Sequence, residues 1–543
     1  MRPDAEDVGV PAGQRLAAAS LGRAAELVLI ATALLLGVGV AVFVVKPQIA
    51  PQVQFDTAAS VIHFERLVSG ERLEAFVTTT PKPLLTVVDG LLHRFGGWAA
   101  VSWMAMVGHG LAVALAALLA LRLGGWAAAG FVAAALAGNA FLLVEAAYAY
   151  GVPWAVALWC VAGLLLASDR PRWGWAGVAL LAAMLIRIET AAIVAAACLV
   201  LVVVHVRRRS RWWDATSLPR GAWLLVFVPA LALPIMLVHD WLLTGDPMFW
   251  ASVAARYSVS ARARAAVLSP LDVVVSLGSF VAGQPIVALL AGIGVAVALV
   301  RRRWIGVVGV LGVGLGIAAF LVLLSVRGTY VSSRYVAPIE LAMLFGAGLA
   351  VGAVMGQIFN GSTVSAGSVW RSALRTVVAP ALIGAFLGIA TTMPWGPFDR
   401  ATVAYISRER RVQAHAAEVA GPIAAVLDRL PDSRTMPPPP AGVAVPSGRP
   451  VVLFVPGLLR PRMAVDLGLP VDRVTSFGTE ELRSPGDVFA PGQLVYHDRR
   501  AGQTNKAYGV LEGSEPFEWE GLLFHPVVSD PEAGYWVWET REE

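Results

Sequence analysis

The sequence contains few charged residues and few cysteines for its length. Only 15% of its 543 residues are Asp, Glu, Lys or Arg, and 57% are hydrophobic, whereas soluble globular chains carry roughly 25% charged residues. Most of the chain is therefore expected to be solvated by lipid. The two cysteines, Cys160 and Cys198, both lie in apolar runs. This placement excludes a disulfide framework and a cysteine zinc site in the soluble part of the chain.

The formal net charge of +5 does not indicate a nucleic-acid-binding protein. The basic residues lie in short clusters beside apolar runs, for example at 207–211 and 301–303. Clusters in such positions are typical determinants of membrane topology. We therefore expect membrane lipids, and no nucleic acid, among the partners of this chain.

Apolar runs that approach or exceed the roughly 20 residues needed to cross a bilayer recur along the chain. We predict eleven spans, at about 24–45, 98–121, 124–144, 152–167, 174–187, 190–206, 222–243, 273–300, 304–326, 335–358 and 376–393. The arginine clusters fall on the side of the N-terminus, which predicts a cytoplasmic N-terminus and, with eleven spans, an outside C-terminus. We expect the chain to lie in the plasma membrane. Gly348, Gly352 and Gly356 predict a close helix-packing face.

The predicted fold class is a polytopic α-helical membrane protein with a small soluble α/β C-terminal domain. We expect a cytoplasmic tail at 1–23, a transmembrane module at 24–393 and an extracytoplasmic domain at 394–543. Within the module, segments 46–97 and 244–272 are longer than simple connections require. The last domain is expected to contain a helix over 400–430, a buried strand at 450–456 and further strands near its end.

Two residues in segment 46–97 are candidates for chemistry. Asp56 follows the first span, where its carboxylate can take a proton from an acceptor hydroxyl. Lys82 stands between Pro81 and Pro83, which restrict the backbone around a point charge suited to a phosphate. The alternatives are an ordinary interfacial aspartate and a lysine that extends toward the interface from a helix start.

Three further groups carry charge near predicted span ends. Arg334 and Tyr335 begin the tenth span and suit phosphate recognition, or they anchor the helix at the interface. Arg187 and Glu189 interrupt an apolar stretch, where charged residues mark a functional cavity or simply pair with other groups in the bundle. Arg256 and Tyr257 lie in the basic segment 244–272, which is suited to a polyanionic lipid head group or is a disordered loop.

Together these residues resemble a known group of membrane enzymes. The acidic Asp56 after the first span, the Lys82-Pro83 step and the Arg334-Tyr335 pair before Pro338 are similar to the motifs of GT-C glycosyltransferases. The resemblance is closest to the clan of protein O-mannosyltransferases and lipid A aminoarabinose transferases. The soluble C-terminal domain is also similar to that of actinobacterial cell-envelope members.

This resemblance implies a hexosyl- or pentosyltransferase that uses a polyprenyl-phosphate-linked sugar and an envelope glycan, lipid or protein acceptor. It implies that Asp56 is the base of a single inverting displacement, and that Lys82, Arg334 and Arg256 stabilise the leaving phosphate. Tyr335, Tyr257, Arg187 and Glu189 are then substrate-binding candidates. Asp56 is followed by Thr57 rather than a second acid, and Lys82 by one proline rather than two, which leaves the acceptor open.

Two other classes of function remain possible on the sequence alone. One is a lipid or sugar transporter, or flippase, although the charged groups gather at one predicted face rather than mid-membrane. The other is a non-catalytic scaffold for envelope assembly. No certain cofactor and no metal site is predicted, because the histidines lack a paired spacing. A divalent cation remains compatible with a polyprenyl-phosphate substrate.

Overall fold

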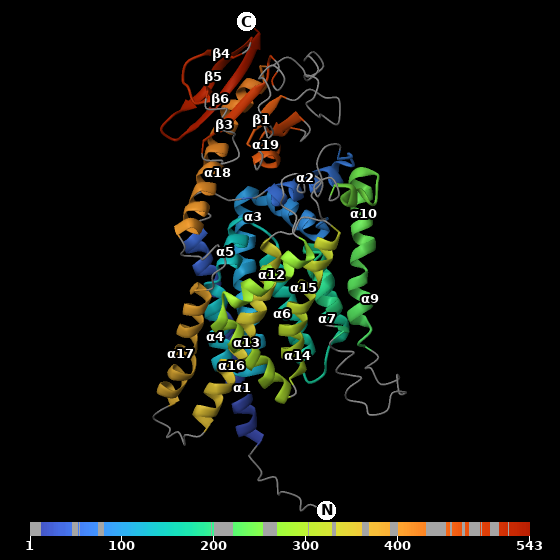
Figure 1. Cartoon of the computed structure of the whole chain (residues 1–543), viewed down its shortest axis with the longest axis vertical. Helices are drawn as coiled ribbons and strands as arrows, with labels where there is room; N and C mark the ends of the chain where they lie inside the picture. The colour runs from blue at the N-terminus through green and yellow to red at the C-terminus, as the bar shows by residue number, and fades with distance from the viewer. Residues whose placement is uncertain are drawn as a thin grey trace, which may run out of the picture.

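A computed structural model gives the fold of most of the chain. It describes residues 12–45, 53, 55–73, 81–196, 198–199, 221–253, 269–301, 303–327, 333–360, 369–390, 400–429, 452–456, 459–469, 473–476, 489, 491–499, 510–519 and 521–542. Figure 1 shows an elongated molecule, with a long helical bundle at one end and a small sheet at the other.

The bundle consists of helices that follow most of the predicted spans. Their bounds are α1 (Ala12–Val45), α2 (Phe55–Ser69), α3 (Pro83–Gly124), α4 (Trp126–Ala137), α5 (Ala140–Ala147), α6 (Val152–Ala167), α7 (Trp173–Ile186), α9 (Leu224–Ala230), α10 (Ala232–Thr244), α12 (Pro270–Ala282), α13 (Pro285–Val300), α14 (Trp304–Val307), α15 (Val313–Val326), α16 (Ala337–Asn360) and α17 (Val369–Ala390). A π-helical turn joins α14 to α15, and a 3-10 turn precedes α16.

Several of these helices are long and apolar enough to cross a membrane. Within the described residues there are five, or up to seven if each of two bent helix pairs is one span. The predicted span 124–144 is bent by 48° between α4 and α5, and the predicted span 273–300 by 91° between α12 and α13. Asn139 explains the first break, because its side chain caps the start of α5 and thereby ends α4.

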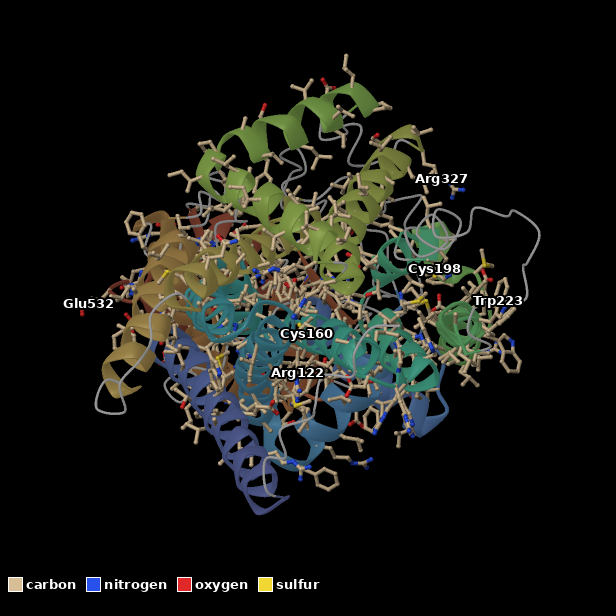
Figure 2. All side chains as sticks on the ribbon, turned by 90° about the horizontal axis from the view of Figure 1, so that it is seen from below. Arg122, Cys160, Cys198, Trp223, Arg327 and Glu532 are labelled. Atoms are coloured by element: carbon tan, nitrogen blue, oxygen red, sulfur yellow. The ribbon has the colours of Figure 1, made fainter. Side chains whose placement is uncertain are left out.

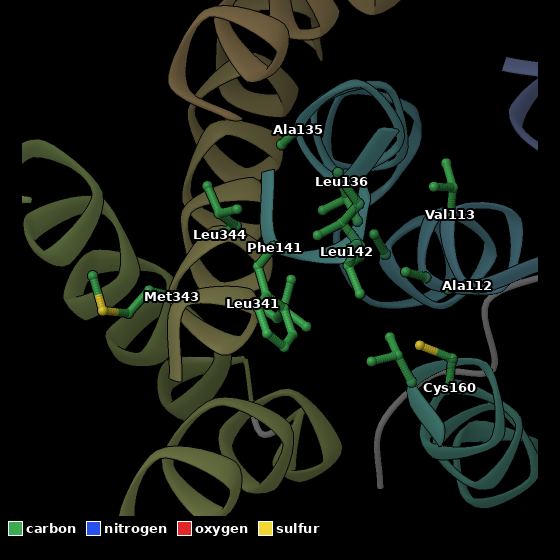
Figure 3. Close-up of a cluster of buried hydrophobic side chains, with 14 of the residues drawn as sticks. Ala112, Val113, Ala135, Leu136, Phe141, Leu142, Cys160, Leu341, Met343 and Leu344 are labelled. Atoms are coloured by element: carbon green, nitrogen blue, oxygen red, sulfur yellow. The ribbon is translucent and has the colours of Figure 1, made fainter. Parts of the chain in front are cut away.

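The interior of the bundle is built from small and medium-sized apolar side chains. Figure 3 shows part of this core, where Phe141 of α5 lies beside Leu341 of α16. The predicted glycine face on α16 is confirmed at two positions. A Cβ atom on Gly348 would lie 2.5 Å from Val132, and one on Gly352 would lie 2.4 Å from the carbonyl oxygen of Gly124. These glycines let α16 pack closely against its neighbours.

The two cysteines differ in how deeply they are buried. Cys160 is buried in the bundle core and Cys198 is only partly buried, and both are free thiols. Seen from the end opposite the sheet, Cys160 lies near the middle of the bundle, whereas Cys198 lies nearer its edge (Figure 2).

Segment 46–97 contains more helix than its description as a loop suggests. Helix α2 begins one residue before Asp56, and α3 starts at Pro83 rather than near residue 98. Helix α3 is interrupted at Gly96 and Gly97, whose backbone angles are not helical. The first part of α3 therefore belongs to the former loop, and the second part matches the predicted span.

The C-terminal domain has the predicted α/β character. Its helices are α18 (Arg400–Leu427) and α19 (Arg460–Asp466), and its strands are β1 (Leu453–Val455), β2 (Val474–Ser476), β3 (Leu494–Asp498), β4 (Phe517–Trp519), β5 (Leu522–Asp530) and β6 (Tyr535–Glu542). They form one mixed sheet in the order β2-β1-β3-β6-β5-β4. Strand β1 is parallel to β2 and β3, and the other pairs are antiparallel.

The central strands of the sheet place apolar side chains alternately on its two faces, so both faces are buried. Tyr496 and Val537 pack with the apolar side of α18, whereas Val495, Trp536 and Trp538 pack on the opposite face with Phe454 and Phe524. This is the period-2 alternation of a strand. In Figure 1, α2 lies between this domain and the bundle.

Candidate functional site

Asp56 and Lys82, singled out separately in the sequence, form an ion pair. Lys82 Nζ donates to Asp56 Oδ2 at 2.8 Å. Asp56 lies in the first turn of α2, and Lys82 is the residue before the first helical residue of α3. The fold therefore brings together a carboxylate and an ammonium group that are 26 residues apart in the chain.

The position of Lys82 at a helix start has an electrostatic consequence. The N-terminus of a helix carries a partial positive charge, so an ammonium group at this end needs an anion nearby. Asp56 supplies one, and the free backbone N–H groups of the first turn of α3 supply additional donors to any anion that binds there. The Pro83 ring opens α3, as its missing N–H allows. Positive charge is therefore concentrated at Lys82 and the start of α3.

A short loop between α5 and α6 contacts Lys82 and the neighbour of Asp56. Lys82 Nζ lies 5.8 Å from the ring centroid of Tyr150, within range of a cation–π contact. Thr57, the neighbour of Asp56, donates through Oγ1 to the carbonyl oxygen of Ala149 at 3.1 Å. Ala149 has a φ of 56°, in the left-handed region that costs about 1–3 kcal/mol and is concentrated at functional sites. The loop is thus held in a strained form against both ends of the ion pair.

Arg187 and Glu189 form a second ion pair with each other, whereas the sequence indicated only that each pairs with other groups of the bundle or marks a cavity. Arg187 Nη2 donates to Glu189 Oε1 at 2.6 Å, and both residues follow the end of α7. They line a pocket together with Tyr335. The remaining lining side chains are apolar or aromatic and come from α5, α6, α15 and α16: Phe141, Val152, Ala155, Trp159, Ile317 and Pro338.

The two ion pairs lie on either side of a tight packing contact around Gly151. A Cβ atom on Gly151 would lie 2.6 Å from both Leu85 and Ile186. Leu85 follows Lys82 by one helical turn, Ile186 precedes Arg187, and Gly151 follows Tyr150 in the chain. Leu85, Ala155 and Ile186 also form one buried cluster. The Asp56–Lys82 pair and the pocket are therefore neighbouring parts of one region.

The other candidate residues are placed only in part. The main chain of Arg334 lies in the 3-10 turn Ser333–Val336 before α16, but its side chain lies outside the described residues. Tyr335 lines the pocket and contacts the Phe320 ring at 5.8 Å between centroids. Arg256 and Tyr257 both lie outside the described residues. Their assignment to the donor stays a prediction.

A buried polar group near Lys82 was missed by sequence reasoning. Thr86, one turn after Lys82, is hydrogen-bonded to His239 Nε2 at 3.3 Å, and His239 Nδ1 lies 3.2 Å from Asp240. Asp240 in turn accepts from the backbone N–H of Trp250 at 2.9 Å. These contacts fix α10 against α3. The adjacent histidine and aspartate within an apolar run were the signal that could have found them.

The described residues contain no group of three or more His, Cys, Asp or Glu side chains that could hold a metal ion. His63 and His239 approach each other at 6.0 Å between ring centroids, but a histidine pair alone does not complete a coordination shell. A divalent cation at this site stays a prediction.

No protein-family profile and no curated protein matches the sequence. Solved structures do show a similar fold. The ArnT protein from Cupriavidus metallidurans, crystallised with undecaprenyl phosphate, is 16% identical, with a TM-score of 0.52 over 94% of this chain and 97% of that chain. The oligosaccharyltransferase AglB from Archaeoglobus fulgidus, in complex with an inhibitory peptide and a dolichol-phosphate, is 11% identical, with a TM-score of 0.47 over 81% of this chain and 63% of that chain.

The likeness to ArnT extends over nearly the whole of both chains and so includes the C-terminal domain. The chain therefore shares the fold of the ArnT structure. The predicted fold class, a polytopic α-helical membrane protein with a small α/β domain at its C-terminus, is confirmed. This likeness concerns the fold, and the chemistry has to be argued from the residues of this chain.

Proposed function

We propose that this chain, a membrane protein with the GT-C fold, is a glycosyltransferase that moves a sugar from a polyprenyl-phosphate donor to an envelope acceptor outside the cytoplasm. The observation that carries the proposal is the 2.8 Å contact between Lys82 and Asp56 at the start of α3. It places a proton acceptor beside a cationic anion-binding position. The undecaprenyl phosphate bound in the ArnT structure supports a lipid phosphate as the ligand class.

The proposed reaction is a single inverting displacement. The acceptor hydroxyl oxygen attacks the anomeric carbon while its proton passes to Asp56. The bond from that carbon to the phosphate oxygen breaks, and the polyprenyl phosphate leaves with the bonding electrons. Lys82 and the start of α3 stabilise the charge that develops on this phosphate. Loss of one such positioned donor typically costs about 100- to 1000-fold in turnover.

The neighbouring pocket is proposed to bind the rest of the donor. Its lining is apolar and aromatic, and the Arg187–Glu189 pair supplies polar contacts at its edge. Its free volume of about 10 Å³ holds no more than a water molecule, so the pocket has to widen when an isoprene unit or a sugar binds. Arg334, Tyr335, Arg256 and Tyr257 complete the proposed donor site. On this proposal the C-terminal domain and the catalytic face lie on the same extracytoplasmic side of the plasma membrane.

The direct test of the function compares envelope glycans and lipids by mass spectrometry in cells with and without the gene. A sugar that is missing without the gene, and restored by the wild-type gene but not by Asp56→Asn, is the expected result. Restoration by Asp56→Asn would favour a transporter or a scaffold, because neither needs a base at this position. No difference in any glycan or lipid would contradict the transferase.

A further inference from the structure

The C-terminal domain contacts the bundle at the interruption of α3. Gly97 has a φ of 60°, which favours glycine, and with Gly96 it separates α3 into two parts. The first part begins beside Lys82, and the second part begins at Trp98 and runs through the bundle. The angle between the two parts determines where Lys82 lies relative to the rest of the protein.

Trp98 is bound by the C-terminal domain directly after this interruption. Its Nε1 donates to Asp466 Oδ1 at 2.6 Å, although Asp466 is 368 residues further along the chain. The other carboxylate oxygen of Asp466 accepts from Arg462 Nε at 3.2 Å. The His93 ring, before the interruption, lies 4.2 Å from the Trp98 ring. One cluster thus contacts both parts of α3.

The arginine of this cluster is itself held inside the protein. Arg462 is buried, and its Nη1 donates to Gln413 on α18. Its guanidinium carbon lies 6.0 Å from the Trp98 ring. Burial lowers the pKa of Arg462, and the Asp466 carboxylate opposes that change. Asp466 is therefore satisfied from both sides, by a rigid buried cation and by an indole N–H.

Helix α2 connects the same cluster to Asp56. Ile62 of α2 belongs to the apolar core of the C-terminal domain, together with Leu459 and Met463 from the α19 region. On α3, a Cβ atom on Gly90 would lie 2.0 Å from the Phe64 ring of α2. Helix α2 carries Asp56 and is thus packed between the C-terminal domain and the first part of α3. That part of α3 begins beside Lys82.

We propose that Trp98, Asp466 and Arg462 are positioning residues, through which the C-terminal domain sets the geometry of the Asp56–Lys82 pair. This inference rests on the proposed transferase function. It assigns the C-terminal domain a part in the reaction that does not require contact with the substrate. A displacement of about 1 Å at a reacting group can lower a rate by about 100-fold.

The test measures kcat and KM for the donor in purified full-length protein. Trp98→Phe removes the N–H and leaves the Asp466–Arg462 pair intact, so the protein remains folded. We expect kcat to fall by about 10- to 100-fold, with KM for the donor unchanged. Asp466→Asn is expected to act in the same direction, and Asp466→Glu to recover part of the activity. The double variant Trp98→Phe/Asp466→Asn should be less impaired than the two single effects multiplied, because both act through one contact.

A matched control is Glu532→Gln, an exposed residue of the same domain at the edge of the molecule (Figure 2). It should leave kcat and KM unchanged. Wild-type kcat in Trp98→Phe and Asp466→Asn, while Asp56→Asn is inactive, would overturn the inference and leave the proposed function standing. Full activity of Asp56→Asn would instead overturn the proposed function. A fall in melting temperature without a change in kcat would show that the cluster only stabilises the fold.

Discussion

The two ion pairs of the candidate site differ in how they are built and in how far water reaches them. Asp56 and Lys82 come from different helices, and their side chains are 27% and 10% exposed. Arg187 and Glu189 are two residues apart at one helix end, and their side chains are 13% and 9% exposed. A base must meet the acceptor, so the more exposed carboxylate, Asp56, suits catalysis. The more buried Glu189 suits the positioning of Arg187.

This difference assigns separate tasks to the two pairs. The pair formed across α2 and α3 depends on the arrangement of the whole bundle and on the C-terminal domain that packs on α2. The local pair depends mainly on the break after α7. Changes to the first pair should therefore affect turnover most, and changes to the second should affect stability most.

The largest expected effect is on turnover in Asp56→Asn. The amide has nearly the same shape but cannot take the acceptor proton. General base catalysis typically contributes about 100- to 10 000-fold, so kcat should fall by about that range while donor binding is retained. Sugar transfer in membranes, with protein amounts matched by immunoblot, measures this. A Glu189→Gln variant that loses as much turnover as Asp56→Asn would reverse the two assignments.

A somewhat smaller loss is expected for Lys82→Met, which keeps the length of the side chain and removes its charge. Turnover should fall by about 100- to 1000-fold because the leaving phosphate loses one positioned cation. Binding of undecaprenyl phosphate, measured by native mass spectrometry, should weaken at the same time. The matched control is Arg429→Met, an exposed basic residue outside the site, which should change neither quantity.

Arg187→Met is expected to act on stability more than on turnover. Removal of one partner of a buried ion pair leaves the other charge uncompensated, which typically costs about 3–5 kcal/mol. The melting temperature of the detergent-solubilised protein should fall clearly. The double variant Arg187→Met/Glu189→Gln should recover part of the loss, because no lone charge is left. An unchanged melting temperature in Arg187→Met would contradict this assignment.

The smallest effect concerns pH and lies away from both pairs. Burial lowers the pKa of His497 below its ordinary value of 6.5, and its ring stacks on Trp536. Between the lowered pKa of His497 in the folded protein and its ordinary pKa of 6.5 in the unfolded chain, the unfolded chain binds more protons than the folded chain. The stability of the C-terminal domain should therefore fall as pH drops below about 6.5. His497→Gln should flatten this dependence in thermal unfolding followed by tryptophan fluorescence. A dependence as steep as in the wild type would exclude His497 as its source.

The sequence predicts the local features of this protein well and its long-range contacts poorly. The spans, the helix over α18 and the strands β1, β3, β5 and β6 follow from runs and alternation that neighbouring residues determine. The Arg187–Glu189 pair is also local, but the sequence indicated only that these charges pair within the bundle or mark a cavity, and the structure shows that they pair with each other. The contact between Trp98 and Asp466 joins residues 368 positions apart, and no periodicity indicates it.

The residues of the candidate site show the same division between local features and long-range contacts. Asp56 and Lys82 stand out by residue type and context, but only the fold shows that they are paired. Tyr150, Ala149 and Thr57 were missed because nothing in their sequence marks a strained loop that supports an ion pair. The bends between α4 and α5 and between α12 and α13 were also missed, because Asn139 at the first break and Gln284 with Pro285 at the second are short interruptions within long apolar stretches.

The most direct measurement of the central claim is release of polyprenyl phosphate by the purified protein in lipid nanodiscs. A donor labelled in its lipid is incubated with an envelope extract as acceptor, and free polyprenyl phosphate is followed by mass spectrometry. We predict release by the wild-type protein and by the exposed-surface control Glu532→Gln, and release lower by at least about 100-fold with Asp56→Asn. Equal release by the wild-type and Asp56→Asn proteins would contradict the assignment of Asp56 as the base.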